Sequence, residues 1–287
     1  MPQPVNYCPL CHHESSQHFD TRQFRGHPVT NRVCDNCGLV YQSPRMSTIE
    51  LDEFYATEYR QIYQGEEGPT SKDLRTQVGR ASALLKFVSD FVPGVRRHLD
   101  LGCSTGILLE TFRDHYGSYS VGVEPGDAYR KFAQEKGITI YTDIESLLPA
   151  SETPFDLVSM THVLEHLSNP VGYLTYLGEN YLTKDGWLLV EVPNLYSHDS
   201  FEIAHLVNFS AHTLCQTLQR AGFEIVKLES HGQPRSELLP LYLTVLARPG
   251  QRAGEIVLEK HVARKRQFGL FRRRVVQKLF PKKAWLY

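Results

Sequence analysis

The chain has 287 residues, a length that favours two domains, and no apolar stretch approaches the ~18 residues that span a membrane. Its hydrophobic (41%) and charged (22%) fractions are those of a globular protein that buries a core. The net charge of −1 combines +9 in residues 251–287 with −10 elsewhere, which excludes a uniformly basic nucleic-acid binder. The N-terminus has no basic start followed by an apolar run, so we expect a cytoplasmic protein without a signal peptide.

Four of the six cysteines fall in the first forty residues. They form two C-x-x-C pairs, Cys8 with Cys11 and Cys34 with Cys37, and Gly38 follows the second pair. This spacing predicts a zinc ribbon over residues 1–45, in which four thiolates hold a structural zinc ion. Alternatives are a disulfide framework, or a histidine from the pair at 12–13 replacing one thiolate.

A helical linker is expected over residues 46–92. Ser47 and Glu50 have the spacing of a capping box, and tyrosines recur at helical spacing at positions 55, 59 and 63. A glycine- and proline-containing break at 64–71 marks a boundary, and residues 70–92 read as a long amphipathic helix.

Strand and helix patterns then alternate over residues 93–249. This alternation predicts a doubly wound, Rossmann-like α/β domain with a seven-stranded, mostly parallel sheet. The expected strands are VRRHLDL, YSVGVEP, ITIYTDI, PFDLVSM, GWLLVEVPN, GFEIVKLES and LYLTVLARP. Ligands of such sheets bind at the carboxyl ends of the strands.

The first turn of this domain has the composition of a ligand-binding loop. Asp100, Gly102, Ser104 and Gly106 alternate along it, so that the backbone approaches a ligand and Ser104 is expected to cap the next helix. Glu124 ends the following strand, where a carboxylate holds ribose hydroxyls. The dinucleotide pattern G-x-G-x-x-G is absent, which favours a cofactor without pyrophosphate.

The segments LDLGCSTG, VGVEPG, YTDIESL, FDLVSMTHVLEHLSNP and LTKDGWLLVEVPN resemble the class I S-adenosylmethionine-dependent methyltransferases. The resemblance covers about residues 95–230. It implies that the glycine turn holds the methionine end, that Glu124 binds the ribose, and that Asp143 and Ile144 flank the adenine. The complete set of cofactor-binding residues that it implies is Asp100, Gly102, Cys103, Ser104, Gly106, Glu124, Pro125, Asp143, Ile144, Thr161 and His162.

The stretch from His162 to His166 also contains H-x-x-E-H, the pattern of inverted zinc peptidases. A peptidase needs this motif inside a long helix, whereas here it follows the fourth strand, at the expected rim of the active site. A narrower alternative remains open. Some small-RNA and quinone-precursor methyltransferases carry E-x-x-E-H here and bind a divalent ion, but His162 replaces the first glutamate.

The cysteine pairs followed by a methyltransferase core are similar to bacterial methyltransferases of nucleotide-linked sugars and related glycan precursors. That resemblance places His205 as general base, His166 as a residue that positions the acceptor, and Tyr59 at the pocket. Ala204 stands where those enzymes have a glutamate, which weakens the case for C-methylation.

Residues 250–287 form a basic extension in which apolar and cationic positions fall on different helical faces. Such a helix lies on an anionic membrane surface or packs on its own domain with its charges solvated. The leading hypothesis for the whole chain is methyl transfer to a small hydroxylated acceptor, with nucleic acid an unlikely partner. The alternatives are an RNA methyltransferase and a binding module on a degenerate methyltransferase fold.

Overall fold

The computed structural model describes residues 2–47, 50, 68–150, 154–199 and 201–286. Near the N-terminus lies a four-stranded antiparallel sheet with the order β1-β2-β3-β9. Its strands are β1 (Ser16–Phe24), β2 (His27–Cys34), β3 (Val40–Gln42) and β9 (Val207–Asn208). Because β9 comes from the second half of the chain, this sheet joins the N-terminal module to the larger domain.

The larger domain contains the predicted seven-stranded sheet, in the order β10-β11-β8-β7-β4-β5-β6. The five strands from β8 to β6 run parallel, and β11 is antiparallel to both of its neighbours. Its members are β4 (Arg97–Leu101), β5 (Tyr119–Val123), β6 (Thr139–Tyr141), β7 (Phe155–Thr161), β8 (Leu182–Pro193), β10 (Phe223–His231) and β11 (Tyr242–Pro249). The Rossmann-like expectation is confirmed.

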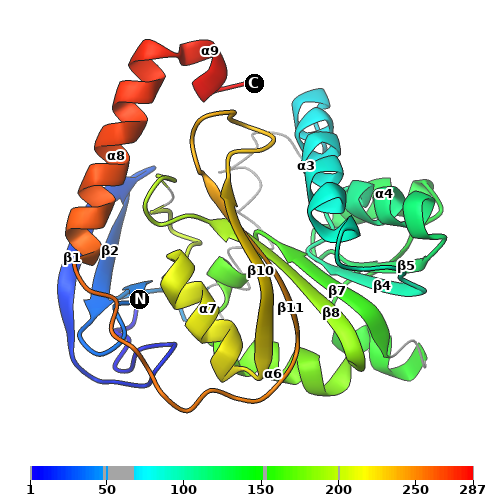
Figure 1. Cartoon of the computed structure of the whole chain (residues 1–287), viewed down its shortest axis with the longest axis horizontal. Helices are drawn as coiled ribbons and strands as arrows, with labels where there is room; N and C mark the ends of the chain where they lie inside the picture. Colours follow the sequence, from blue (N-terminus) through cyan, green and yellow to red (C-terminus); the bar gives the residue numbers. More distant parts are fainter. Residues whose placement is uncertain (1, 48–49, 51–67, 151–153, 200, 287) are drawn as a thin grey trace.

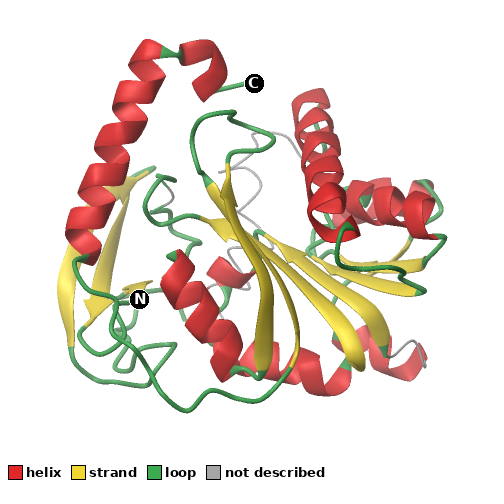
Figure 2. Ribbon diagram, viewed as in Figure 1, coloured by secondary structure: helices red, strands yellow, loops and turns green. Residues whose placement is uncertain are grey.

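Helices cover both faces of this sheet (Figure 2). On one face lie α3 (Ser71–Ser89) and α4 (Ile107–Tyr116), and on the other α6 (Pro170–Asn180) and α7 (Ala211–Arg220). Alternate strand residues serve the two cores: Val158 packs with α6 and α7, and Leu157 with α3 and α4. The remaining elements are α5 (Asp127–Glu135), α8 (Val262–Leu279), α9 (Pro281–Ala284) and the 3-10 turns η1 (Glu145–Ala150) and η2 (Leu164–His166).

Two helix starts follow their local sequence. The Ser47 amide and the Glu50 carboxylate form the predicted capping box at 2.8 Å, and Thr70 and Asp73 form another at the start of α3. The long helix expected at 70–92 is therefore confirmed. The tyrosines at 55, 59 and 63 lie outside the described residues.

The C-terminal extension returns across the molecule after β11. Residues 250–261 run past α7 to the cysteine module, where the Glu259 amide donates to the Cys37 carbonyl at 3.2 Å. The helix α8 then runs beside β1 and β2 (Figure 1). Among the described residues, no helix has the length and apolar character needed to cross a bilayer.

Candidate functional site

The four cysteines of the N-terminal module converge on one point. The Sγ atoms of Cys8 and Cys37 lie 3.5 Å apart, as do those of Cys11 and Cys34, and all four lie within 4.8 Å. Tetrahedral zinc with bonds of 2.3 Å needs sulfur separations of about 3.8 Å, so this donor set fits the ion. All four thiols are free, which contradicts the disulfide alternative.

Gly38 makes the second cysteine turn feasible. Its φ of +80° lies in the left-handed region, and an added Cβ would stand 2.7 Å from the Glu259 carbonyl oxygen. Gly38 therefore allows the tight turn after the second cysteine pair, and it also leaves room for the C-terminal segment around Glu259.

The glycine turn after β4 is pressed against the motif after β7. Gly102 has a φ of +68°, and a Cβ there would stand 2.6 Å from Cγ2 of Val163. Val163 sits between His162 and Leu164, so the expected cofactor loop and the histidine-containing turn touch. This contact brings together two stretches that lie sixty residues apart.

Glu124 organises the same loop from the end of β5. Its carboxylate accepts hydrogen bonds from the Ser104 amide at 3.0 Å and the Gly126 amide at 2.7 Å. A carboxylate at this strand end is the group that the resemblance places against the ribose hydroxyls. The arrangement fits the cofactor that the resemblance implies.

Ser104 does not cap the next helix, contrary to expectation. The residue before α4 is Gly106, and no side chain caps that end. The Ser104 hydroxyl instead accepts from Nε2 of Gln77 at 3.0 Å, and Thr105 donates to the same amide. Gln77, on α3, thus holds the turn from outside. No sequence pattern marks this role, because the contact joins residues 27 positions apart.

Asp100 is buried at the base of the loop. It accepts a hydrogen bond from the Ser159 hydroxyl at 2.7 Å, and Ser159 also contacts Nε2 of His98 at 2.8 Å. Burial raises the pKa of Asp100 to about 7, while the bond from Ser159 opposes this shift. In the same region the Cys103 thiol is buried against Gly122, where an added Cβ would overlap it.

The residues predicted around the adenine and at the strand ends lie at the expected edge of the sheet. Asp143 accepts from the Ser146 amide at 2.9 Å, which fixes the loop after β6. Ile144 is buried, Pro125 directly follows Glu124, and Thr161 ends β7. Their cofactor contacts remain predictions.

His162 is held between two buried carboxylates. It adopts a left-handed φ of +56°, with Nδ1 3.2 Å from Glu165 and Nε2 3.3 Å from Glu191. The motif occupies a 3-10 turn, which does not fit the long helix of a peptidase. Because both of its ring nitrogens face carboxylates, His162 helps to orient the turn that follows it.

The structure brings Glu165, His166 and His205 together. Ligand atoms of the three side chains lie within 4.8 Å of one another, and the two imidazole rings stand edge to face with centroids 4.9 Å apart. Nδ1 of His166 donates to the Ala204 carbonyl at 2.8 Å, which leaves Nε2 of that ring as the acceptor atom. Burial lowers the pKa of His166 to about 4, so its ring is neutral at neutral pH.

Glu165 lies beneath this pair as a buried anion. Burial alone raises its pKa, but the hydrogen bond from His162 and the neighbouring histidines lower it to about 2. On the other side, Nε2 of His205 lies 3.8 Å from Glu202, an ion-pair distance that is too long for a hydrogen bond.

Glu191 is a further buried carboxylate that sequence analysis missed. It pairs with Arg80 at 2.8 Å and His231 at 3.3 Å, and it accepts from the Thr244 hydroxyl at 3.0 Å. Burial raises the pKa of Glu191, but the bonds from His162 and His231 and the charge of Arg80 hold it well below its usual range. No local pattern marks these partners, because four separate elements supply them.

A family model for the methyltransferase domain matches residues 74–228. The chain belongs to this family. The match contains the glycine turn, Glu124 and both rim histidines, and it confirms a class I S-adenosylmethionine-dependent methyltransferase domain.

Curated relatives match a shorter stretch. A ubiquinone biosynthesis O-methyltransferase from Hahella chejuensis is 34% identical over 90 residues, which cover 29% of this chain and 37% of that protein. One from Cereibacter sphaeroides (strain ATCC 17025) is 37% identical over 101 residues, 33% of this chain and 39% of that protein. The chain thus aligns with less than half the length of these relatives.

Solved structures share the fold. The plantazolicin methyltransferase BpumL, in complex with a monoazolic desmethylPZN analog and SAH, has a TM-score of 0.52 and 12% identity, covering 70% of this chain and 94% of that one. A chain of the complex that contains the Haloferax volcanii Trm112 methyltransferase activator has a TM-score of 0.52 and 14% identity, covering 70% and 98%.

Proposed function

We propose that this methyltransferase transfers a methyl group to a hydroxyl of a small acceptor, a nucleotide-linked sugar or a related glycan precursor. The observation that carries the proposal is the cluster of Glu165, His166 and His205, of which the first two lie on the turn that contacts the glycine loop through Val163. Support for a hydroxyl acceptor also comes from the curated relatives, which are named as O-methyltransferases.

We propose that the cofactor is held by the residues of the glycine turn, by Glu124 and by the segment around Asp143. S-adenosylmethionine, when bound, supplies an electrophilic methyl group and a good leaving group. The chain must then align the acceptor oxygen and take its proton. His205 is assigned as the base because it is buried between Glu165 and Glu202, whose charges stabilise the imidazolium that forms.

His166 is assigned a positioning role. Its Nδ1 is committed to the Ala204 carbonyl, next in the chain to His205, so the two rings are held as one unit. Its Nε2 is the ring atom that accepts a hydrogen bond from an acceptor hydroxyl. Tyr59, proposed to close the pocket, lies outside the described residues.

The cysteine module is proposed to bind one structural zinc ion. Four thiolates complete a tetrahedral shell and leave no position for substrate, so this ion takes no part in the transfer.

The test is methyl transfer from labelled S-adenosylmethionine to a panel of nucleotide-linked sugars, with bulk RNA as the competing substrate. Label on a sugar hydroxyl supports the proposal, whereas label on RNA alone overturns it in favour of the RNA methyltransferase. Each reaction is repeated after chelation and with added Mg²⁺. Loss of turnover that Mg²⁺ restores would assign Glu165, His166 and His205 to a metal ion instead of to a base.

A further inference from the structure

The C-terminal helix α8 buries arginines against the domain, whereas an ordinary surface helix buries its apolar face. Arg266 is only 4% exposed; it donates to the backbone carbonyls of Leu195 and His198, and its guanidinium lies 3.9 Å above the Phe201 ring. Arg273, two turns later, donates to the Ser197 carbonyl at 3.1 Å. These bonds dock α8 through polar groups.

Close backbone contact on the same side confirms this orientation. A Cβ on Gly269 would overlap the Tyr196 carbonyl oxygen, so the helix lies directly on the 195–199 loop. Val276 packs with the buried cluster that contains Leu239 and Tyr242.

The opposite face of α8 presents an apolar stripe to solvent. Phe268 is 70% exposed, Phe271 62%, Val275 37% and Leu279 63%. At 3.6 residues per turn, these four positions fall within a sector of about 80°. A helix that only packed on its own domain would bury such a stripe. The helix does pack on its own domain, as one alternative from the sequence expected, but this packing leaves the apolar stripe uncovered.

Cations flank this stripe, and α8 itself contains no acidic residue. On α9, Lys283 lies 4.0 Å from the carboxylate of Glu237. Residues 260–287 contain ten lysines and arginines and no aspartate or glutamate. Exposed members on α8 and α9 include Arg264, Arg272, Arg274, Lys278, Lys282 and Lys283. An apolar stripe flanked by cations is complementary to an anionic bilayer, where apolar side chains enter the interface and cations meet headgroup phosphates.

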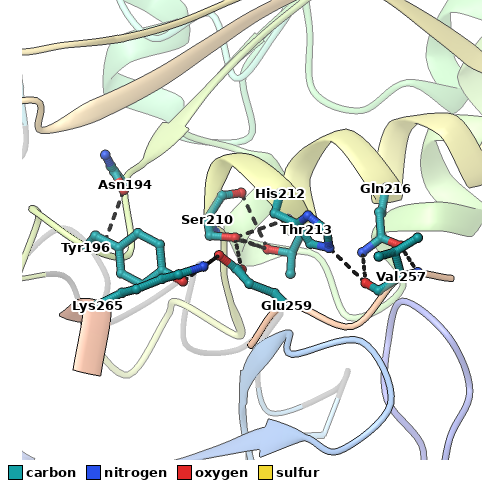
Figure 3. Close-up of polar contacts among 9 residues, drawn as sticks. All are labelled: Asn194, Tyr196, Ser210, His212, Thr213, Gln216, Val257, Glu259 and Lys265. Carbon is teal, nitrogen blue, oxygen red and sulfur yellow. Dashed lines mark hydrogen bonds and ion pairs between the residues drawn. The ribbon is translucent and has the colours of Figure 1, made fainter. Parts of the chain in front are cut away.

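The segment that leads into α8 is tightly held (Figure 3). The Glu259 carboxylate accepts from the Tyr196 hydroxyl at 2.7 Å, from the Ser210 hydroxyl and from Lys265 at 2.9 Å. The amide of Val257 donates to Gln216 at 2.7 Å. These contacts hold α8 firmly on the methyltransferase domain. When α8 binds a surface, the whole domain therefore takes a defined orientation relative to that surface.

The face is also linked to the candidate site. The 195–199 loop beneath α8 includes His198, whose ring lies 5.7 Å from that of Tyr242, and Tyr242 stands edge to face with His162 at 5.1 Å. Thus α8 lies against the loop that borders the histidine-containing rim.

We propose that the outer face of α8 docks on an anionic phospholipid bilayer. Phe268, Phe271 and Leu279 enter the headgroup boundary, and the flanking cations contact lipid phosphates. This inference is independent of the proposed acceptor.

The test is co-sedimentation of the full chain with vesicles of phosphatidylcholine, alone or mixed with phosphatidylglycerol. We expect binding to the mixed vesicles that weakens with salt. The double variant F268S/F271S should bind at least about tenfold more weakly, because two exposed rings no longer leave water. R272E/K278E should bind at least about 30-fold more weakly, given the contribution of each cation at an anionic surface.

Matched controls are Val78→Ser on α3, where the valine is 53% exposed, and Arg96→Glu, where the arginine side chain is 91% exposed. Both should bind vesicles as the unchanged chain does. All altered positions are exposed, so every variant should keep its melting temperature, which is checked by circular dichroism.

Equal binding of the α8 variants and the controls would overturn the proposal, as would no binding of the unchanged chain. Self-association that F268S/F271S abolishes, without vesicle binding, would assign the stripe to a second copy of this chain. Retention of bulk RNA that depends on Arg272 and Lys278 but not on the phenylalanines, again without vesicle binding, would assign the cations to nucleic acid.

Discussion

The imidazole rings of His166 and His205 stand edge to face, with centroids 4.9 Å apart. The first ring donates its Nδ1 proton to the carbonyl of Ala204, immediately before the second. The two histidines lie 39 positions apart in the chain, yet this hydrogen bond joins the segments that carry them.

Loss of His205 should lower the single-turnover rate by ~10²–10⁴, the usual contribution of a general base. His205→Ala is compared with His166→Ala, which should raise the acceptor KM more than it lowers the rate. S-adenosylmethionine binding is measured in parallel by calorimetry and should be unchanged. A near-normal rate for His205→Ala would mean that alignment alone drives the transfer.

Replacement of Glu124 should weaken cofactor binding at least about tenfold, because hydrogen bonds to a carboxylate contribute ~1.5–3 kcal/mol each. Glu124→Ala also releases the amides of Ser104 and Gly126, so the loop itself loosens. Calorimetry on Glu124→Ala and on Glu135→Ala, an exposed control on α5, provides the measurement. Equal dissociation constants would place the cofactor elsewhere.

The purified protein should contain one zinc ion per chain, bound to the cysteine cluster. Cys34→Ser should lose the metal and destabilise the fold by roughly 3 kcal/mol or more, since binding energy of a structural zinc is folding energy. Cys215→Ser, which changes a half-buried thiol on α7, should retain the ion. Elemental analysis measures the zinc content, and thermal unfolding measures the stability of each variant. A purified chain that contains no zinc and is as stable as expected for the folded protein would contradict the zinc site.

Asp100 should make the protein less stable as the pH rises. Its folded-state pKa is about 7, above the ~4 of an unfolded aspartate, so the folded state keeps a proton that the unfolded state loses. Stability should fall between pH 4 and pH 7 by up to about 4 kcal/mol from this group alone.

Asp100→Asn removes this titration. Relative to the unchanged chain, the variant should be more stable at pH 8 than at pH 5, as measured by urea unfolding. Asp114→Asn, at a 78% exposed side chain on α4, is the control and should show no such difference. Parallel pH profiles for Asp100→Asn and the unchanged chain would show that this carboxyl is ionised in the fold.

Removal of the Glu259 carboxylate should destabilise the chain by ~1.5–3 kcal/mol, the range for a hydrogen bond to a charged group. Glu259→Ala leaves the hydroxyls of Tyr196 and Ser210 without their acceptor (Figure 3). Glu255→Ala, exposed on the same segment, should be neutral. Unfolding curves with equal midpoints for the two variants would show that Glu259 does not hold the segment.

Short-range patterns by themselves predicted much of this protein. The cysteine pairs, the Ser47–Glu50 cap and the glycine turn depend on residues a few positions apart, so composition and spacing were sufficient. The strand alternation likewise predicted the sheet, because burial on both faces demands near-continuous apolar runs. The placement of Glu124 at a strand end followed from that sheet.

Only the tertiary structure decided which distant side chains meet. Glu191 pairs with Arg80 and His231, which lie on other elements, and Gln77 on α3 donates a hydrogen bond to Ser104. No periodicity in the sequence indicates such contacts. The orientation of α8 is the clearest case. Its sequence shows separate apolar and basic faces, but the carbonyls of the 195–199 loop accept hydrogen bonds from arginines, and buried polar groups must be paired. The arginines therefore turn inward and the phenylalanines face solvent.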